Sequence, residues 1–228
     1  MEKQIKIGLV IADSDEFLPL EKKAEQLNAV PVTVAGRRAL KFTARNAEVT
    51  AVLCGIGKVN AAVAATALAE RGADILLNCG LSGGISGVAR GQLTIPNRFL
   101  EHDFDLSGIG YKLCEKPGQE YIYSADEKLL AALLKIVPAA KVGTAVCGDC
   151  FVSDAQLRDK LKAEFSAMSC DMETAAIASV AHFYSLPFLA LRKVSDDAGN
   201  DAGADYRELN ILAEDVLITT LLELICSL

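Results

Sequence analysis

Three acidic residues far apart in the chain, Glu16, Glu173 and Asp196, have side chains suited to acid–base chemistry. Glu173 stands out because it directly precedes a run of small apolar residues in the segment "CDMETAAIASVA", residues 170–181. A helix that is apolar on every face is normally buried, and a buried carboxylate is costly unless it is paired or hydrogen-bonded. We therefore expect Glu173 to have a bound partner.

Paired carboxyl groups suit the cleavage of a glycosidic bond, because one protonates the leaving group while the other activates water on the opposite face of the sugar. Each of the three acids also has an ordinary structural explanation. Glu16 could be a first-turn helix residue favoured by the helix dipole, Glu173 a helix-start acid, and Asp196 an N-cap. The residue types alone leave both interpretations open.

Apolar runs that predict strands alternate along the chain with segments that predict helices. This alternation predicts a single α/β domain over residues 1–228, with a central mixed, largely parallel β-sheet flanked by helices on both faces. Capping boxes predict helix starts at Ser124–Glu127 and Ser153–Gln156. The expected strands are residues 5–12, 49–53, 75–79, 142–146 and 187–194, and the expected helices run from Asp15 to before Pro31 and over residues 58–70, 127–137, 172–184 and 207–228.

Glycines or carboxylates follow each expected strand. In sheets of this kind, ligands bind beyond the carboxyl ends of the strands. The five strand ends therefore predict one shared crevice. The segments that follow the strands are Asp13 to Glu16, Gly55-Ile-Gly57, Gly80 to Gly84, Gly148 to Phe151, and Ser195-Asp196-Asp197.

Composition narrows the class of ligand. A net charge of −7 argues against nucleic acid or an anionic membrane as partner. No apolar run approaches the roughly 18 residues of a membrane span, and the first ten residues do not resemble a secretory signal. The seven cysteines lie mostly in apolar contexts, so we expect reduced thiols in a cytoplasmic protein. A small molecule is the expected partner.

Several familiar motifs are incomplete. Gly55-Ile-Gly57-Lys58 matches neither the Walker pattern nor the dinucleotide fingerprint. Cys147-Gly-Asp-Cys150 lacks a second pair, and the ligand types of residues 101–105 stand alone, so we expect no metal or cofactor. With two histidines and no GxSxG elbow, a Ser-His-Asp hydrolase is not expected.

Six short motifs, in order and spacing, carry a resemblance that covers nearly the whole chain: "KIGLVIADSDE", "GIGKVNAA", "NCGLSGG", "GDCFV", "DMETAAIA" and "RKVSD". The chain resembles the purine nucleoside phosphorylase/nucleosidase superfamily, and within it the bacterial 5'-methylthioadenosine/S-adenosylhomocysteine nucleosidases. The resemblance implies a nucleoside phosphorylase-like fold and hydrolysis of the N-glycosidic bond of an adenine nucleoside, with no cofactor.

The resemblance also implies roles for particular residues. It makes Glu16 the base that activates water, Asp196 the acid that protonates the purine at N7, and Glu173 the acceptor of hydrogen bonds from the ribose hydroxyls. Other positions match the family's ligand contacts: Met172 at the ribose, Phe151 stacked on the base, the Val152 backbone at the base edge, Arg192 near the ribose and water, Ile56 at the 5' pocket, and Leu81, Ser82, Gly83 and Ser195 around the substrate. Ile109 and Pro117 match positions where a partner subunit closes the pocket, which implies a homodimer.

Three departures from the family leave the 5' substituent open: Asp13 for an apolar residue, Leu81 for a small one, and Asp171 for Glu. 5'-Deoxyadenosine and futalosine-like compounds remain alternatives. A phosphorylase binds phosphate, normally with arginine, yet Asn78 occupies the corresponding position, so we favour water as the nucleophile. A catalytically silent nucleoside-binding protein is the alternative from another class.

Overall fold

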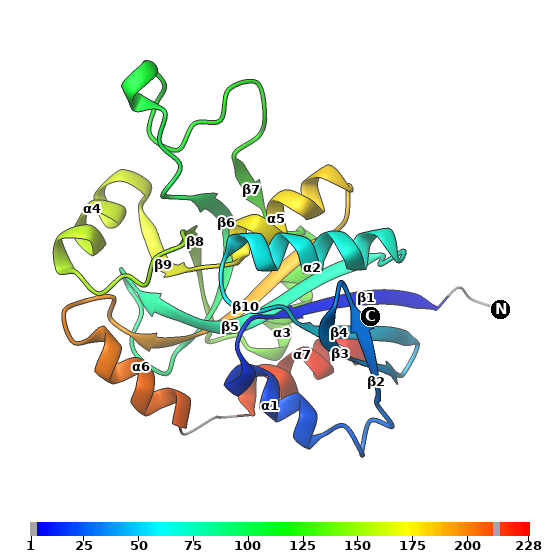
Figure 1. Ribbon diagram of the computed structural model, residues 1–228. Helices are drawn as coiled ribbons and strands as arrows, with labels where there is room; N and C mark the ends of the chain where they lie inside the picture. The colour runs from blue at the N-terminus through cyan, green and yellow to red at the C-terminus, as the bar shows by residue number, and fades with distance from the viewer. Residues whose placement is uncertain (1–3, 212–214) are drawn as a thin grey trace.

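The β-strands form one mixed, ten-stranded sheet in the computed structural model, which describes residues 4–211 and 215–228 (Figure 1). In chain order the elements are β1 (Ile5–Ile11), α1 (Ser14–Lys22), β2 (Val30–Val34), β3 (Arg37–Ala44), β4 (Ala47–Leu53), α2 (Lys58–Glu70), β5 (Ile75–Gly84), β6 (Leu93–Glu101), η1 (Ser107–Ile109), β7 (Ile122–Ser124), α3 (Glu127–Ile136), β8 (Lys141–Cys147), α4 (Ala155–Phe165), β9 (Ala167–Asp171), α5 (Thr174–Phe183), β10 (Phe188–Asp196), α6 (Ala202–Ile211) and α7 (Val216–Ser227).

The sheet has a central parallel part with antiparallel additions. β1 pairs in parallel with β4 and β5, and β5 with β10. β5 also pairs with β9, and β10 with β6, so that β5, β10, β6, β8 and β9 close into a ring. Every residue of β10 is buried, as expected of a strand covered on both faces. The predicted mixed α/β fold is confirmed.

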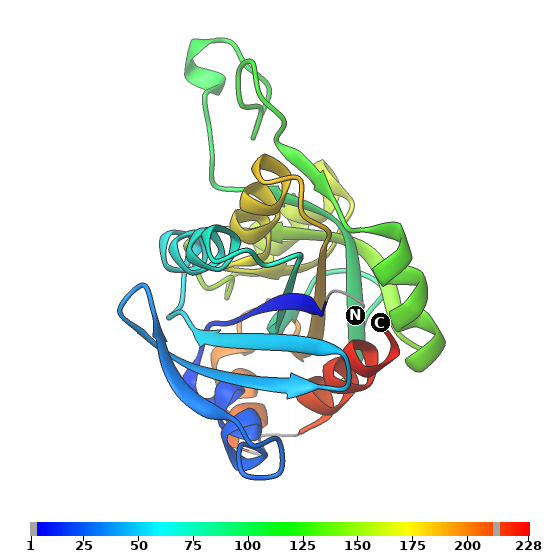
Figure 2. The same cartoon turned by 90° about the vertical axis from the view of Figure 1, so that its right-hand side faces the viewer.

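Helices cover both faces of this sheet. α2 and α5 lie side by side on one face, and α1 and α7 lie on the other (Figures 1 and 2). The alanines of α2 and α5 allow close packing, and Gly8 of β1 helps, since a Cβ there would lie 2.9–3.0 Å from side-chain atoms of Leu76 and Leu68. The small residues therefore bring the helix ends close to the strand ends.

Several predicted boundaries were wrong. β5 runs on to Gly84, beyond the expected end at residue 79, whereas α1 ends before Pro31 as expected, at Lys22. The N-caps of α3 and α4 are Asp126 and Asp154, whose carboxylates accept backbone hydrogen bonds, and not Ser124 and Ser153. β2, β3, β6, β7 and β9 were not predicted. The expected terminal helix spans residues 212–214, which lie outside the described residues, and its described parts are α6 and α7.

The segment between β6 and β7, residues 102–121, is an arm that stands away from the body in both views (Figures 1 and 2). It contains the short helix η1. Ile109, at the end of η1, is 72% exposed, and Pro117 is also exposed. Both residues therefore lie at the surface of the arm in this chain.

Candidate active site

The carboxyl ends of the strands surround a cavity of about 530 Å³. It brings together the three acids that the sequence singled out, from α1, from the start of α5 and from the end of β10. The lining residues are Ala12, Asp13, Glu16, Ile56, Leu81, Ser82, Gly83, Phe151, Cys170, Asp171, Met172, Glu173, Ser195, Asp196, Gly203 and Tyr206. The shared crevice expected from the strand ends therefore exists.

Glu16 is held at the cavity wall by two backbone amides. As third residue of α1 it completes a capping box, accepting from the N–H of the N-cap residue Asp13 at 3.3 Å through Oε2. Its Oε1 accepts from the N–H of Leu81, at 2.7 Å. Burial raises the pKa of Glu16 to about 7, with a smaller contribution from the charge of Glu173, against the lowering effect of Arg192. A carboxylate with this pKa can take up a proton near neutral pH.

Glu173 is the N-cap residue of α5, yet its side chain makes no capping hydrogen bond. Asp171 caps the helix instead, since its Oδ1 accepts from the N–H groups of Glu173 and Thr174, at 2.9 Å each. The Glu173 carboxylate is therefore free to face the cavity, where Oε1 accepts from the N–H of Gly57 at 3.0 Å. Burial raises its pKa, while the nearby charge of Arg192 opposes the shift.

Arg192 lies behind the cavity wall, is completely buried and does not line the cavity. Its Nε is 3.5 Å from Asp171 Oδ2, and its Nη2 is 3.7 Å from Glu173 Oε2 and donates to Asn78 Oδ1 at 2.7 Å. Gly80 leaves room for this arrangement, because a Cβ there would lie 2.3 Å from Arg192 Nη1 and 2.8 Å from Glu16 Oε1. The guanidinium and the Glu16 carboxylate thus both approach the space that a side chain at residue 80 would fill.

Asp196 is the last residue of β10, so it is not a helix N-cap. The Ser195 hydroxyl lies 2.6 Å from its Oδ2, and the N–H of Ala198 donates to its Oδ1 at 2.8 Å. Burial raises the pKa of Asp196, hydrogen bonds from Ser195 and Ala198 oppose the rise, and the Asp197 charge adds a smaller upward effect. The side chain is only 2% exposed, which favours a protonated carboxyl more than an exposed position would.

The remaining predicted residues divide into two groups. Met172, Phe151, Ile56, Leu81, Ser82, Gly83 and Ser195 line the cavity. Val152 is buried and does not line it, and neither Ile109 nor Pro117 on the arm reaches it within this chain.

Tyr206, Gly203 and Cys170 line the cavity but were not predicted. The Tyr206 ring meets the Phe151 ring edge-on, with centroids 5.6 Å apart. Burial raises the pKa of the Tyr206 hydroxyl, as do the charges of Glu16 and Asp13. No local sequence signal marked Tyr206, because it lies just before the segment interpreted as an amphipathic terminal helix.

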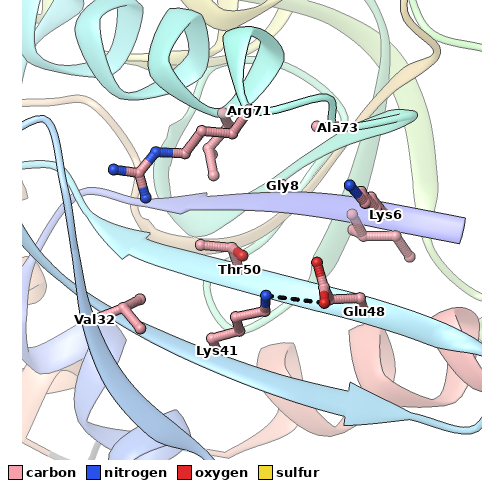
Figure 3. Close-up of a pocket in the computed structure, with 10 residues that line it drawn as sticks. Lys6, Gly8, Val32, Lys41, Glu48, Thr50, Arg71 and Ala73 are labelled. Atoms are coloured by element: carbon pink, nitrogen blue, oxygen red, sulfur yellow. Dashed lines mark ion pairs between the residues drawn. The ribbon is translucent and has the colours of Figure 1, made fainter.

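Other parts of the described chain offer less chemistry. Within residues 4–211 and 215–228, no group of three His, Cys, Asp or Glu side chains could hold a metal, and no helix there is long and apolar enough to cross a membrane. Glu101 and Asp103 form ion pairs with Lys58. A second cavity of about 320 Å³, between α2 and the sheet, contains Lys6, Lys41 and Arg71 but none of the predicted site residues (Figure 3).

The chain belongs to the phosphorylase superfamily, whose family model matches residues 6–227. A 5'-methylthioadenosine/S-adenosylhomocysteine nucleosidase of Shewanella piezotolerans is 34% identical over 217 residues, covering 92% of this chain and 94% of that protein. One from Anoxybacillus flavithermus is 33% identical over 211 residues, covering 89% and 90%.

Solved structures of such nucleosidases are also similar. The Helicobacter pylori enzyme with butyl-thio-DADMe-Immucillin-A superimposes with a TM-score of 0.93 at 26% identity, covering 100% of both chains. The Streptococcus pyogenes enzyme in complex with 5-methylthiotubericidin gives a TM-score of 0.92 at 28% identity, covering 100% of this chain and 98% of that one.

The raised pKa of Glu16 predicts a stability cost at high pH. Its pKa in the folded protein, about 7, exceeds its ordinary value of 4.5. Ionising it therefore opposes folding, and the cost grows as pH rises from 4.5 to 7. Glu16→Gln resembles the protonated form. Its free energy of unfolding should exceed that of wild type by about 2–3 kcal/mol at pH 8, with no such gain at pH 4.5. Urea titrations at the two pH values measure this. Glu25→Gln, at an exposed position after α1, is the control, and an equal gain there would contradict the assignment.

The pairing of Arg192 with Asp171 predicts that the charge of Asp171 is needed for folding. Asp171→Asn leaves a fully buried guanidinium with one counter-charge fewer, so we expect a loss of about 3 kcal/mol in the free energy of unfolding. The matched control is Asp159→Asn. It breaks the ion pair between Asp159 and Arg158, in which the Asp159 side chain is 66% exposed. We expect the control to lose less than about 1 kcal/mol. Equal losses in the two variants would show that the buried ion pair contributes no more to stability than the exposed one.

Proposed function

We propose that the protein hydrolyses the N-glycosidic bond of 5'-substituted adenine nucleosides, 5'-methylthioadenosine and S-adenosylhomocysteine, and releases adenine. The observation that carries this proposal is the convergence of Glu16, Glu173 and Asp196 on one cavity. The named activity of the relatives, which align over about nine-tenths of the chain, supports the substrate class.

Asp196 is the general acid in this proposal. Breaking the bond between C1' and N9 places positive charge on the ribose and negative charge on the purine. A proton delivered to N7 neutralises the purine as it leaves, and general acid help of this kind is worth roughly 10²–10⁴-fold in rate. The buried position of Asp196 and its raised pKa support its holding that proton. The Ser195 hydroxyl beside Oδ2 keeps the carboxyl in one orientation.

Glu16 is the general base that takes a proton from the attacking water. The N–H groups of Asp13 and Leu81 fix both of its oxygens, so its direction is set before the substrate binds. Its pKa of about 7 suits proton transfer at neutral pH. Arg192 lies close behind it across Gly80 and stabilises the ionised form.

Glu173 holds the ribose. One of its oxygens is occupied by the N–H of Gly57, at the positive end of the α2 helix dipole. The other, Oε2, faces Arg192 at 3.7 Å, and the carboxylate lines the cavity beside Met172. A carboxylate that accepts hydrogen bonds from two ribose hydroxyls recovers the hydration that it lost on burial. Phe151, 45% exposed at the rim, stacks on the base. The resemblance assigns the base edge to the backbone of Val152, which follows Phe151 but does not line the cavity in the structure.

Water, not phosphate, is the proposed nucleophile. None of the described residues that line the cavity is Lys, Arg or His. Five of them are carboxylates: Asp13, Glu16, Asp171, Glu173 and Asp196. A phosphate dianion would meet these carboxylates without a cation in the wall to bind it. Arg192 is already engaged with Asp171, Glu173 and Asn78.

The proposed enzyme is a cytoplasmic homodimer that acts in methionine salvage. Exposed apolar side chains support the dimer: Val59 and Val63 of α2 and Phe183 of α5 are 72%, 48% and 66% exposed, and Ile109 on the arm is 72% exposed. Such side chains on adjoining helices are typical of a protein interface. All seven cysteines are free, as expected of a chain in a reducing compartment.

The function is tested by adding 5'-methylthioadenosine to the protein and following adenine release by ultraviolet absorbance. We expect turnover that does not depend on phosphate, and at least about a 100-fold lower kcat in Asp196→Asn. Strict dependence on phosphate would assign a phosphorylase. Tight binding without adenine release would assign a binding protein, and release only from 5'-deoxyadenosine or futalosine would correct the substrate.

A further inference from the structure

Lys58 is the first residue of α2 and lies outside the cavity wall. Its Nζ is 2.8 Å from Glu101 Oε2, at the end of β6, and 2.6 Å from Asp103 Oδ1, at the base of the arm. Lys116, farther along the arm, also pairs with Glu101. The side chains of Lys58, Glu101 and Lys116 are 17%, 15% and 13% exposed, and that of Asp103 is 29% exposed, so this ion cluster is partly enclosed.

Backbone hydrogen bonds close a circuit through the same residues. The Lys58 N–H donates to Asp149 Oδ1 at 2.8 Å, and the Asp149 N–H donates to Asp103 Oδ2 at 2.9 Å. The chain can approach this closely only because residue 57 is glycine. It has a φ of +102°, and a Cβ there would lie 3.1 Å from Asp149 Oδ1. The start of α2, the base of the arm and the turn after β8 are therefore tied together.

Two of these connections lead into the nucleoside cavity. Gly57, next to Lys58, donates its N–H to Glu173, the proposed ribose carboxylate. Phe151, the proposed stacking residue, is two positions beyond Asp149 on the turn that the circuit holds. Glu173, proposed to bind the ribose, and Phe151, proposed to stack on the base, are thus both connected to the start of α2.

We propose that Lys58 is a positioning residue for nucleoside binding, which holds the turn carrying Phe151 in register with the Gly57–Glu173 hydrogen bond. The inference deepens the proposed function and rests on it for the identity of the ligand. Lys58 itself touches no substrate. It acts through Asp103 and Asp149.

Charge explains why the position needs a cation. Glu101, Asp103 and Asp149 place three carboxylates around Lys58, and Lys116 supplies only one further cation. Burial alone would raise the pKa of Asp103, but the hydrogen bond and charge of Lys58 and the N–H of Asp149 lower it. Without the Lys58 ammonium, the Asp103 and Asp149 carboxylates would repel each other in a partly enclosed space. The turn that carries Phe151 would then be free to move.

The test is Lys58→Met, which keeps the length and apolar stem of the side chain and removes its charge. Because the proposed role is in binding, we expect KM for 5'-methylthioadenosine to rise at least tenfold and kcat to fall less than threefold. Lys58→Arg should recover most of the loss in KM. The matched control is Lys41→Met, which removes a lysine paired with Glu48 at 2.9 Å on the sheet face shown in Figure 3, away from the nucleoside cavity. We expect both of its constants to stay within twofold of wild type.

A double-mutant cycle with Asp103→Asn separates positioning from general destabilisation. If the two residues act as one clamp, their effects on KM are not additive, and the double variant resembles the worse single one. Asp103→Asn also replaces Lys58→Met as the test if the latter does not fold, and it should raise KM severalfold. A KM within twofold of wild type in folded Lys58→Met, or an equal loss in Lys41→Met, overturns the inference.

The proposed function can fail separately from this inference. If wild type binds 5'-methylthioadenosine but releases no adenine, the nucleosidase assignment fails, and calorimetry then measures Kd in wild type and in Lys58→Met. A tenfold weaker Kd in the variant supports the positioning role. An unchanged Kd, or no binding by wild type, overturns it.

Discussion

The burial of one guanidinium among three carboxylates is the constraint on which this site depends. Arg192 is completely buried, and the charges of Asp171, Glu173 and Glu16 all act on it. One cation cannot neutralise three anions, so a negative excess remains in a largely enclosed space. That excess and the burial together raise the pKa of Glu16 and of Glu173. The same imbalance that opposes folding thus supplies, in Glu16, a carboxyl group whose pKa of about 7 lies near neutral pH.

Backbone geometry decides which carboxylates remain available to a ligand. Asp171 serves both as the cap of α5 and as the main counter-ion of Arg192, which leaves Glu173 to face the cavity. A side chain at Gly80 would collide with both Arg192 and Glu16, and one at Gly57 would crowd Asp149 at the start of α2. The site is therefore preorganised by main-chain N–H groups and glycines more than by side-chain pairs, which suits a reaction in which charge develops at fixed points.

The sequence predicted the strand ends that surround the cavity well, and the edge strands and helix starts poorly. Apolar runs followed by Glu16, Gly83 or Asp196 mark strand ends whatever the exact boundaries, so the acids could be assigned to one edge. α2 was bounded correctly because Gly57 and Gly72 flank a clean run of helix formers. β2 escaped because most of its residues are exposed and one is proline, so it lacks the apolar run that signals a strand. The helix starts near Ser124 and Ser153 were misassigned because Asp126 and Asp154, which follow these serines, accept the hydrogen bonds of the first amides of α3 and α4 instead.

Contacts between distant segments could not be predicted from local pattern. Tyr206 reaches the cavity only because α6 packs near Phe151, and Lys58 meets Asp103 only because β6 ends beside the start of α2. The residue roles came from the resemblance, since spacing alone does not distinguish a base from a cap. The structure shows why Glu16 can be both a capping residue and a base. The hydrogen bond that it accepts in the capping box also fixes the orientation of its carboxylate.

The central claim is that Glu16, Glu173 and Asp196 surround a single ribose. A crystal structure of Asp196→Asn with 5'-methylthioadenosine bound tests it most directly. We predict both ribose hydroxyls on the Glu173 carboxylate, N7 of the purine facing residue 196, and a water between Glu16 and C1' on the face opposite the base. A nucleoside bound in this cavity with its sugar turned away from Glu173, or bound only elsewhere on the protein, would contradict the account.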